Sequence, residues 1–219
     1  MSREDNHEPA GFDPDWDEAG SSSIFFFDED TERRPIKEIY SVFSRPRNDA
    51  DQRGGELAAR WGALDMGGDV EMPRPLGVSE EEWRASPSGE MIVEEGRVPL
   101  LGLGGEEDML YAAPTSNDHI HLALLPNGGG GCGAPGTDGL DLHWAYTPSR
   151  PLVIYGLVGD EIGSVDVVIA GQTYAARMGE NAFGIRVGGS KPSELGTVIL
   201  HRRDGTTKSI PLDPGLYDD

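Results

Sequence analysis

Three histidines are the residues whose types and spacing come closest to a chemical site. His119 and His121 alternate within "DHIHLALL", so on an extended strand both side chains point to one face. His143 follows on the next expected strand and can face them across a ladder, which would complete a zinc-like or nickel-like site. Two histidines two residues apart are an unspecific signal, and half-exposed strand histidines are the competing interpretation. The predicted cofactor is therefore none, with a divalent transition metal as the alternative.

The single cysteine, Cys132, lies in the glycine-rich stretch "NGGGGCG". Neither a Gly-Lys-Ser/Thr sequence nor a helix signal follows, so the stretch lacks the helix N-terminus that holds a phosphate in a P-loop or a dinucleotide-binding fold. A reactive thiolate needs a neighbouring base or a positive dipole, whereas the nearest acidic neighbours in sequence, Asp138 and Asp141, disfavour it. No G-x-S-x-G or H-E-x-x-H motif is present. We predict a loop that connects two strands, in a protein that is not an enzyme.

The charge balance narrows the classes of partner. The 219 residues contain 18 Lys and Arg against 39 Asp and Glu, a formal net charge of −21. Such a surface repels nucleic acid and anionic membranes and favours basic protein partners. One cysteine cannot form an intramolecular disulfide, which suits a reducing cytoplasm. No signal peptide and no run of roughly 20 apolar residues is found, so no membrane span is predicted.

The first 31 residues have the composition of an acidic, mostly disordered tail. Residues 1–30 hold one Arg against ten Asp and Glu, and they contain little apolar surface to offset the entropy of ordering. The exception is a run of four apolar residues, the predicted partner-binding anchor Ile24, Phe25, Phe26 and Phe27. Exposure of these four side chains is unfavourable, so we expect them to dock, either on the protein's own body or in the basic-rimmed groove of a partner.

Residues 32–147 are predicted to form an α+β region. Ile36, Ile39, Tyr40 and Phe43 recur at helical spacing behind Pro35, and a second short helix is expected over Glu56–Leu64, with a polar turn between the two helices. Apolar runs near 90–94, 98–103, 108–113 and 119–125 are separated by glycine-rich or polar turns. This pattern indicates a small antiparallel sheet.

Residues 148–213 are predicted to form an antiparallel β-sandwich that packs on the preceding strands. Strands are expected near 152–158, 164–170, 172–178 and 182–187, with a hairpin over 197–211. The hairpin turn is Asp204-Gly205, a strong two-residue signal. The predicted fold class is therefore mainly β (α+β), with two short N-terminal helices.

Three stretches together resemble uncharacterised β-rich proteins of high-GC Gram-positive bacteria: "VFSRPRNDADQ", "GGGGCG" and "VIYGLVGDEIGSVDVVIAGQTYAARMGENAFGIRV". In that group a helix ends in an Arg-Pro turn, a glycine-rich cysteine loop follows, and a β-domain carries G-L-V-x-D and D-N-x-F turns. The segments Gly156–Asp160 and Glu180–Phe183 take those two places here, and the resemblance spans roughly residues 40–187. This resemblance implies a fold and does not imply an activity.

This chain departs from that group in two ways. Such proteins often begin with a membrane-spanning or signal-like helix, where this chain has its acidic tail. They also often carry a second cysteine on the strand before the glycine loop, where this chain reads "DHIHLALL". Neither the group's envelope location nor a disulfide therefore carries over directly.

The function predicted from these features is that of a non-catalytic, soluble interaction or structural protein of the cytoplasm. It would bind a protein partner, or assemble with other subunits, through the aromatic anchor of its acidic tail. One alternative is a metal-binding protein or metal-dependent hydrolase that uses His119, His121 and His143. The other is an envelope-associated β-domain.

Overall fold

The described part of the chain forms three antiparallel β-sheets and two α-helices, which confirms the predicted mainly β fold. A computed structural model describes residues 20–24, 34–65, 91–103, 108–115, 118–125, 130–147 and 150–212. The helix-side sheet has the order β2 (Arg97–Leu101), β3 (Met109–Pro114), β4 (Ile120–Leu125), β5 (Gly130–Gly133). The central sheet has the order β1 (Gly20–Ile24), β6 (Asp141–Thr147), β7 (Arg150–Leu157), β11 (Ala182–Val187), β10 (Arg177–Met178). The C-terminal sheet has the order β13 (Thr207–Pro211), β12 (Leu195–Arg202), β8 (Ile162–Ile169), β9 (Gln172–Ala175).

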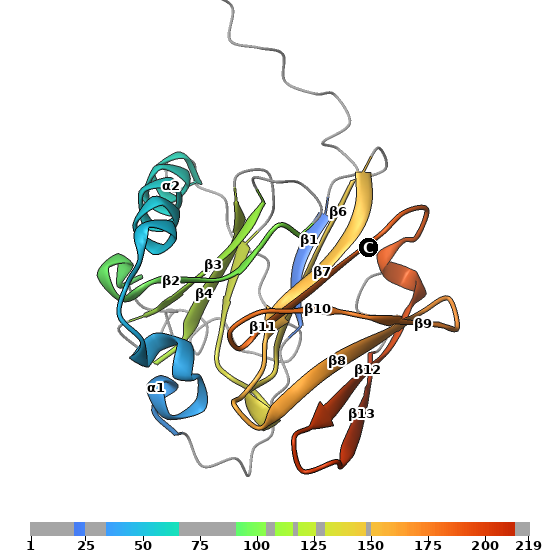
Figure 1. Cartoon of the computed structure of the whole chain (residues 1–219). Coiled ribbons are helices and arrows are strands. Elements are labelled where there is room, and N and C mark those ends of the chain that lie inside the picture. The colour runs from blue at the N-terminus through green and yellow to red at the C-terminus, as the bar shows by residue number, and fades with distance from the viewer. Residues whose placement is uncertain are drawn as a thin grey trace, which may run out of the picture.

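The central sheet is buried on both faces, because side chains alternate along its strands. On β7, Leu152 and Ile154 face the C-terminal sheet, whereas Val153 and Tyr155 face the helix-side sheet. All four are at most 6% exposed. Two separate apolar cores therefore flank this sheet, and the three sheets stack as layers (Figure 1).

The helix α2 (Asp49–Asp65) forms a fourth layer, on the outer face of the helix-side sheet (Figure 1). Ala58 of this helix packs in one cluster with Tyr111, Ala123 and other buried residues of β2, β3 and β4. The short helix α1 (Ile36–Ile39) contributes instead to the core between the helix-side and central sheets. No helix within the described residues is long and apolar enough to span a bilayer.

Both N-terminal helices differ from their predicted bounds. The first ends at Ile39 and is followed by a 3-10 helix at Ser41–Ser44, although the four predicted apolar residues are all buried. The second begins at Asp49, within the stretch expected to be a turn. Its start is fixed by a reciprocal cap: Asp51 N donates to Asn48 Oδ1 (3.0 Å), and Asn48 N donates to Asp51 Oδ2 (2.8 Å).

Two further segments differ from the sequence-based expectation. The glycine-rich stretch contributes a strand, because Gly130–Gly133 pairs with residues 120–123 of β4 through main-chain bonds that need no apolar side chain. The expected strand near 90–94 is an isolated bridge at Met91 and a 3-10 helix at Val93–Glu95. The strands predicted near 152–158, 164–170 and 182–187 and the hairpin over 197–211 are confirmed. The strand predicted near 172–178 is instead two strands, β9 and β10, which belong to different sheets.

Part of the predicted tail is a strand. Gly20–Ile24 forms β1, which pairs with β6 at one edge of the central sheet. Residues 1–19, and the anchor residues Phe25, Phe26 and Phe27, lie outside the described residues. The central sheet also joins β6, from the predicted 32–147 region, to β7, from the predicted 148–213 region.

Candidate functional site

The histidines proposed as metal ligands do not converge. His121 belongs to the face of β4 that carries Ala123 and Leu125 toward α2, whereas His119 lies just before the start of β4. His143, on β6, stacks on Tyr155 in the interface between the central and helix-side sheets. Among the residues that the structure describes, no group of three or more His, Cys, Asp or Glu side chains could hold a metal ion.

Cys132 lies directly across the ladder from His121, because the register pairs these two residues on β5 and β4. Directly opposite residues share a face of the sheet, so Cys132 also belongs to the α2 side. The pairing of the glycine-rich strand with β4 brings these two residues together.

A buried carboxylate–imidazole pair lies beneath the central sheet. His143 Nε2 is 3.0 Å from Asp141 Oδ1, and the two side chains are 1% and 2% exposed. The rings of His143 and Tyr155 are stacked, with centroids 5.6 Å apart. Burial raises the pKa of Tyr155, and the charge of Asp141 adds to that shift. A carboxylate that orients an imidazole is a familiar catalytic arrangement, but here a substrate would reach it only if two packed sheets separated.

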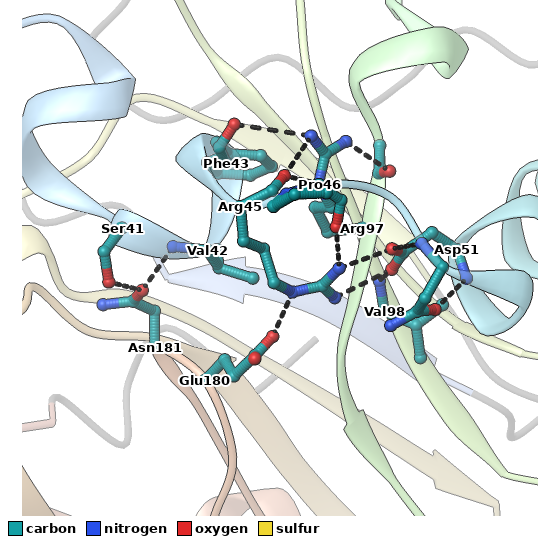
Figure 2. Close-up of polar contacts among 12 residues, drawn as sticks. Ser41, Val42, Phe43, Arg45, Pro46, Asp51, Arg97, Val98, Glu180 and Asn181 are labelled. Carbon is teal, nitrogen blue, oxygen red and sulfur yellow. Dashed lines mark hydrogen bonds and ion pairs between the residues drawn. The ribbon is translucent and has the colours of Figure 1, made fainter.

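An extensive polar network is centred on Arg45 (Figure 2). It lies at the β10–β11 edge of the central sheet, which is the edge opposite β1. Its guanidinium binds Asp51 in a bidentate manner, with Nη1–Oδ2 at 2.5 Å and Nη2–Oδ1 at 2.9 Å, while Nε donates to Glu180. Asp51 is completely buried and also accepts from Val98 N at 2.6 Å. Burial works to raise the pKa of Asp51, but Arg45 and the two backbone N–H donors outweigh it and hold that pKa below its usual value.

Arg97 fastens the same turn to strand β2 through main-chain carbonyl groups. Its guanidinium donates to the carbonyl oxygens of Arg45 (2.9 Å), Glu95 (2.7 Å) and Gly96 (3.0 Å). Arg97 is only 8% exposed, so these acceptors replace its lost hydration. Its bonds fix the chain path between α1 and α2.

A second set of contacts joins the turns at Asp160 and Asn181 to the 3-10 helix, and Figure 2 shows the contacts of Asn181 with Ser41 and Val42. Asn181 donates through Nδ2 to Asp160 Oδ1 (2.7 Å) and accepts from Val42 N (2.9 Å). Asp160 also accepts from the amide and the hydroxyl of Ser41, at 3.0 and 2.8 Å. Asn181 has a φ of 56°, a left-handed conformation that asparagine tolerates better than most residues. Both networks connect side chains from distant segments of the chain.

The seam between β1 and β6 is the described feature that fits an interaction site. Five residues of β1 pair with β6, from Gly20 opposite Tyr146 to Ile24 opposite Leu142. β1 is the last strand at this edge of the central sheet and lies beside β5 of the helix-side sheet. A segment of the acidic region therefore binds the body of the protein by strand addition, a common mode of peptide recognition.

Comparisons with protein-family models, with curated proteins and with solved structures find no match for this chain.

Proposed function

We propose that this protein is a non-catalytic interaction or structural protein that binds a protein partner, or assembles with other copies, through its acidic N-terminal segment. The observation that carries the proposal is the pairing of β1 with β6, because it makes that segment a strand-adding element. The aromatic run that follows, Phe25–Phe27, would supply the apolar contacts.

The charge of the chain supports a basic partner. A net charge of −21, with ten acidic residues among the first 30, would attract a positively charged groove and accelerate encounter at low salt. The single cysteine suits a cytoplasmic location, where a disulfide would not persist.

A pull-down from the source organism with matched variants tests this proposal. The bait is the full chain with a C-terminal tag, and the test variant replaces Phe25, Phe26 and Phe27 with Ser. The control variant, Ser209→Ala on the exposed edge strand β13, leaves the N-terminal segment intact. We expect a specific partner, or a second copy, that is retained by the control, is lost with the triple variant and binds less as salt rises. Identical recovery with the triple variant would overturn the proposal.

A further inference from the structure

We propose that the edge position beside β6, which β1 occupies, is exchangeable. Residues 20–24 of a second copy of this chain then replace β1, and two copies form a strand-swapped dimer. The inference rests on the proposed function and names one partner for the same segment. It follows from the composition of β1, from the pairing pattern on β6 and from the chain that leads away from β1.

The composition of β1 makes it easy to detach. Its sequence is Gly-Ser-Ser-Ser-Ile, in which four of five residues are poor strand formers. β1 is an edge strand that pairs with a single neighbour, β6. Segments of this kind open locally at a free energy well below that of global unfolding.

After β1 leaves, β6 would readily pair with another strand. β6 carries Leu142 and Trp144 into the core and is fixed on its other side by β7, so it keeps its place when β1 leaves. Its free edge would then present unpaired N–H and C=O groups, which are a template for another strand. An exposed edge of this kind is refilled by whichever suitable segment is available.

The register favours an identical segment as the occupant. The Gly and Ser residues of β1 stand opposite Tyr146, Ala145, Trp144 and His143, so small residues face three ring-bearing ones. A foreign segment must reproduce that pattern, whereas residues 20–24 of a second copy reproduce it by definition. Reciprocal exchange recovers every β1–β6 bond and closes with twofold symmetry.

The connection between β1 and α1 has the reach for an exchange. Nine residues, 25–33, separate Ile24 from Arg34 and extend to about 30 Å at most. Two copies with this net charge repel each other, so we expect exchange to increase with ionic strength. The Debye length falls from about 30 Å at 0.01 M salt to about 10 Å at 0.1 M.

Disulfide trapping between two different single-cysteine variants tests the exchange. Both variants carry Cys132→Ala, and one adds Ser21→Cys while the other adds Ala145→Cys, at positions that the register pairs directly. Directly paired residues have Cα atoms about 4.5–5.5 Å apart, within the range of a disulfide. A cross-linked heterodimer in excess of random collision forms in the mixture only where one copy's β1 lies on the other copy's β6.

Two controls define the outcomes. The double variant Ser21→Cys/Ala145→Cys, also with Cys132→Ala, must form this disulfide, within one chain in the monomer and between two chains in the exchanged dimer. A mixture of Ser21→Cys with Ser209→Cys on β13 measures random collision. We expect the test mixture to give an excess of cross-linked dimer over the collision control, to lose it on dilution and to gain it with salt. An amount equal to the collision control, or failure of the double variant to close, overturns the exchange. If partner capture still depends on Phe25–Phe27 in that case, the proposed function survives without it.

Discussion

Asp51 and Glu180 bind the same guanidinium at opposite levels of burial, so alanine at each position separates a buried ion pair from an exposed one. The side chain of Asp51 is 0% exposed, whereas that of Glu180 is 55% exposed. Asp51 accepts four hydrogen bonds, two from Arg45 and one each from the amides of Val98 and Asn48. Glu180 accepts from Arg45 Nε.

The expected losses of stability follow from this difference. Removal of one partner of a buried ion pair costs about 3–5 kcal/mol. Arg45 is 20% exposed and keeps Glu180 as a partner, so the cost at Asp51 comes mainly from the donors that lose their acceptor. Part of that cost at Asp51 is the stranded amide of Val98, since a buried donor without an acceptor costs about 1–3 kcal/mol. An exposed pair contributes less than about 1 kcal/mol. Asp51→Ala should therefore lower the free energy of unfolding by about 3–5 kcal/mol, and Glu180→Ala by less than about 1 kcal/mol.

Urea unfolding followed by far-UV circular dichroism measures both losses. The slope of the free energy of unfolding against urea concentration should be the same in both variants as in the wild type. A control, Asp51→Asn, keeps the side-chain shape without the charge and should fall between the wild type and Asp51→Ala. Because the pKa of Asp51 is lowered, its contribution is present above about pH 4 and is lost as the pH falls through the lower native pKa. Equal losses for Asp51→Ala and Glu180→Ala, or a loss below about 1 kcal/mol for Asp51→Ala, would refute the assignment of the buried pair.

Three other expectations concern backbone conformation, close packing and alkaline pH. Asn181→Ala and Asn181→Gly both lose the bond from Val42 N, but only alanine is strained at a φ of 56°, so the glycine variant should be about 1–2 kcal/mol more stable in urea unfolding. Gly156→Ala would place its Cβ 2.0 Å from a β6 carbonyl oxygen and should lower the free energy of unfolding by about 1–3 kcal/mol or more. Gly196→Ala, whose Cβ would have its nearest contact at 3.6 Å, should have little effect. Equal thermal midpoints for the two variants would contradict this expectation. Burial raises the pKa of Tyr111 to about 12, so the native state keeps this phenol protonated where the unfolded chain ionises. Stability should fall as the pH rises above about 10, and Tyr111→Phe should flatten that fall; an unchanged slope would show that Tyr111 does not cause it.

The β-domain could be predicted from sequence because its turns carry local signals. Asp204-Gly205 was identified as a turn, and the structure gives a left-handed φ value at Gly205. The start of α2 carried a signal too, since Asn48 and Asp51 have the spacing of a reciprocal cap. This cap was not predicted, because Pro46 favoured the interpretation of the polar run that follows it as a turn.

The glycine strand and the polar networks depend on contacts between distant residues, which a single sequence does not record. Gly130–Gly133 has no apolar alternation, so only its pairing with β4 makes it a strand. Arg45 and Glu180 are 135 residues apart, and Val42 and Asn181 are 139 apart. In the sequence, Arg45, Glu180 and Asn181 look like ordinary polar turn residues. The Arg-Pro, G-L-V-x-D and E-N-x-F motifs, separate in sequence, meet in one place.

The two edges of the central sheet are held in different ways, and this difference makes the β1 edge the place for an interaction. At the β10–β11 edge, charged side chains from distant segments fix the turn, with the buried carboxylate of Asp51 bound to Arg45 and the buried Arg97 beside them. At the other edge, a five-residue Gly/Ser-rich strand is paired with β6 alone. Release of β1 would leave the Arg45 network intact, because none of its described contacts involves residues 20–24. The sheet can therefore exchange a strand at one edge while its opposite edge keeps the layers together.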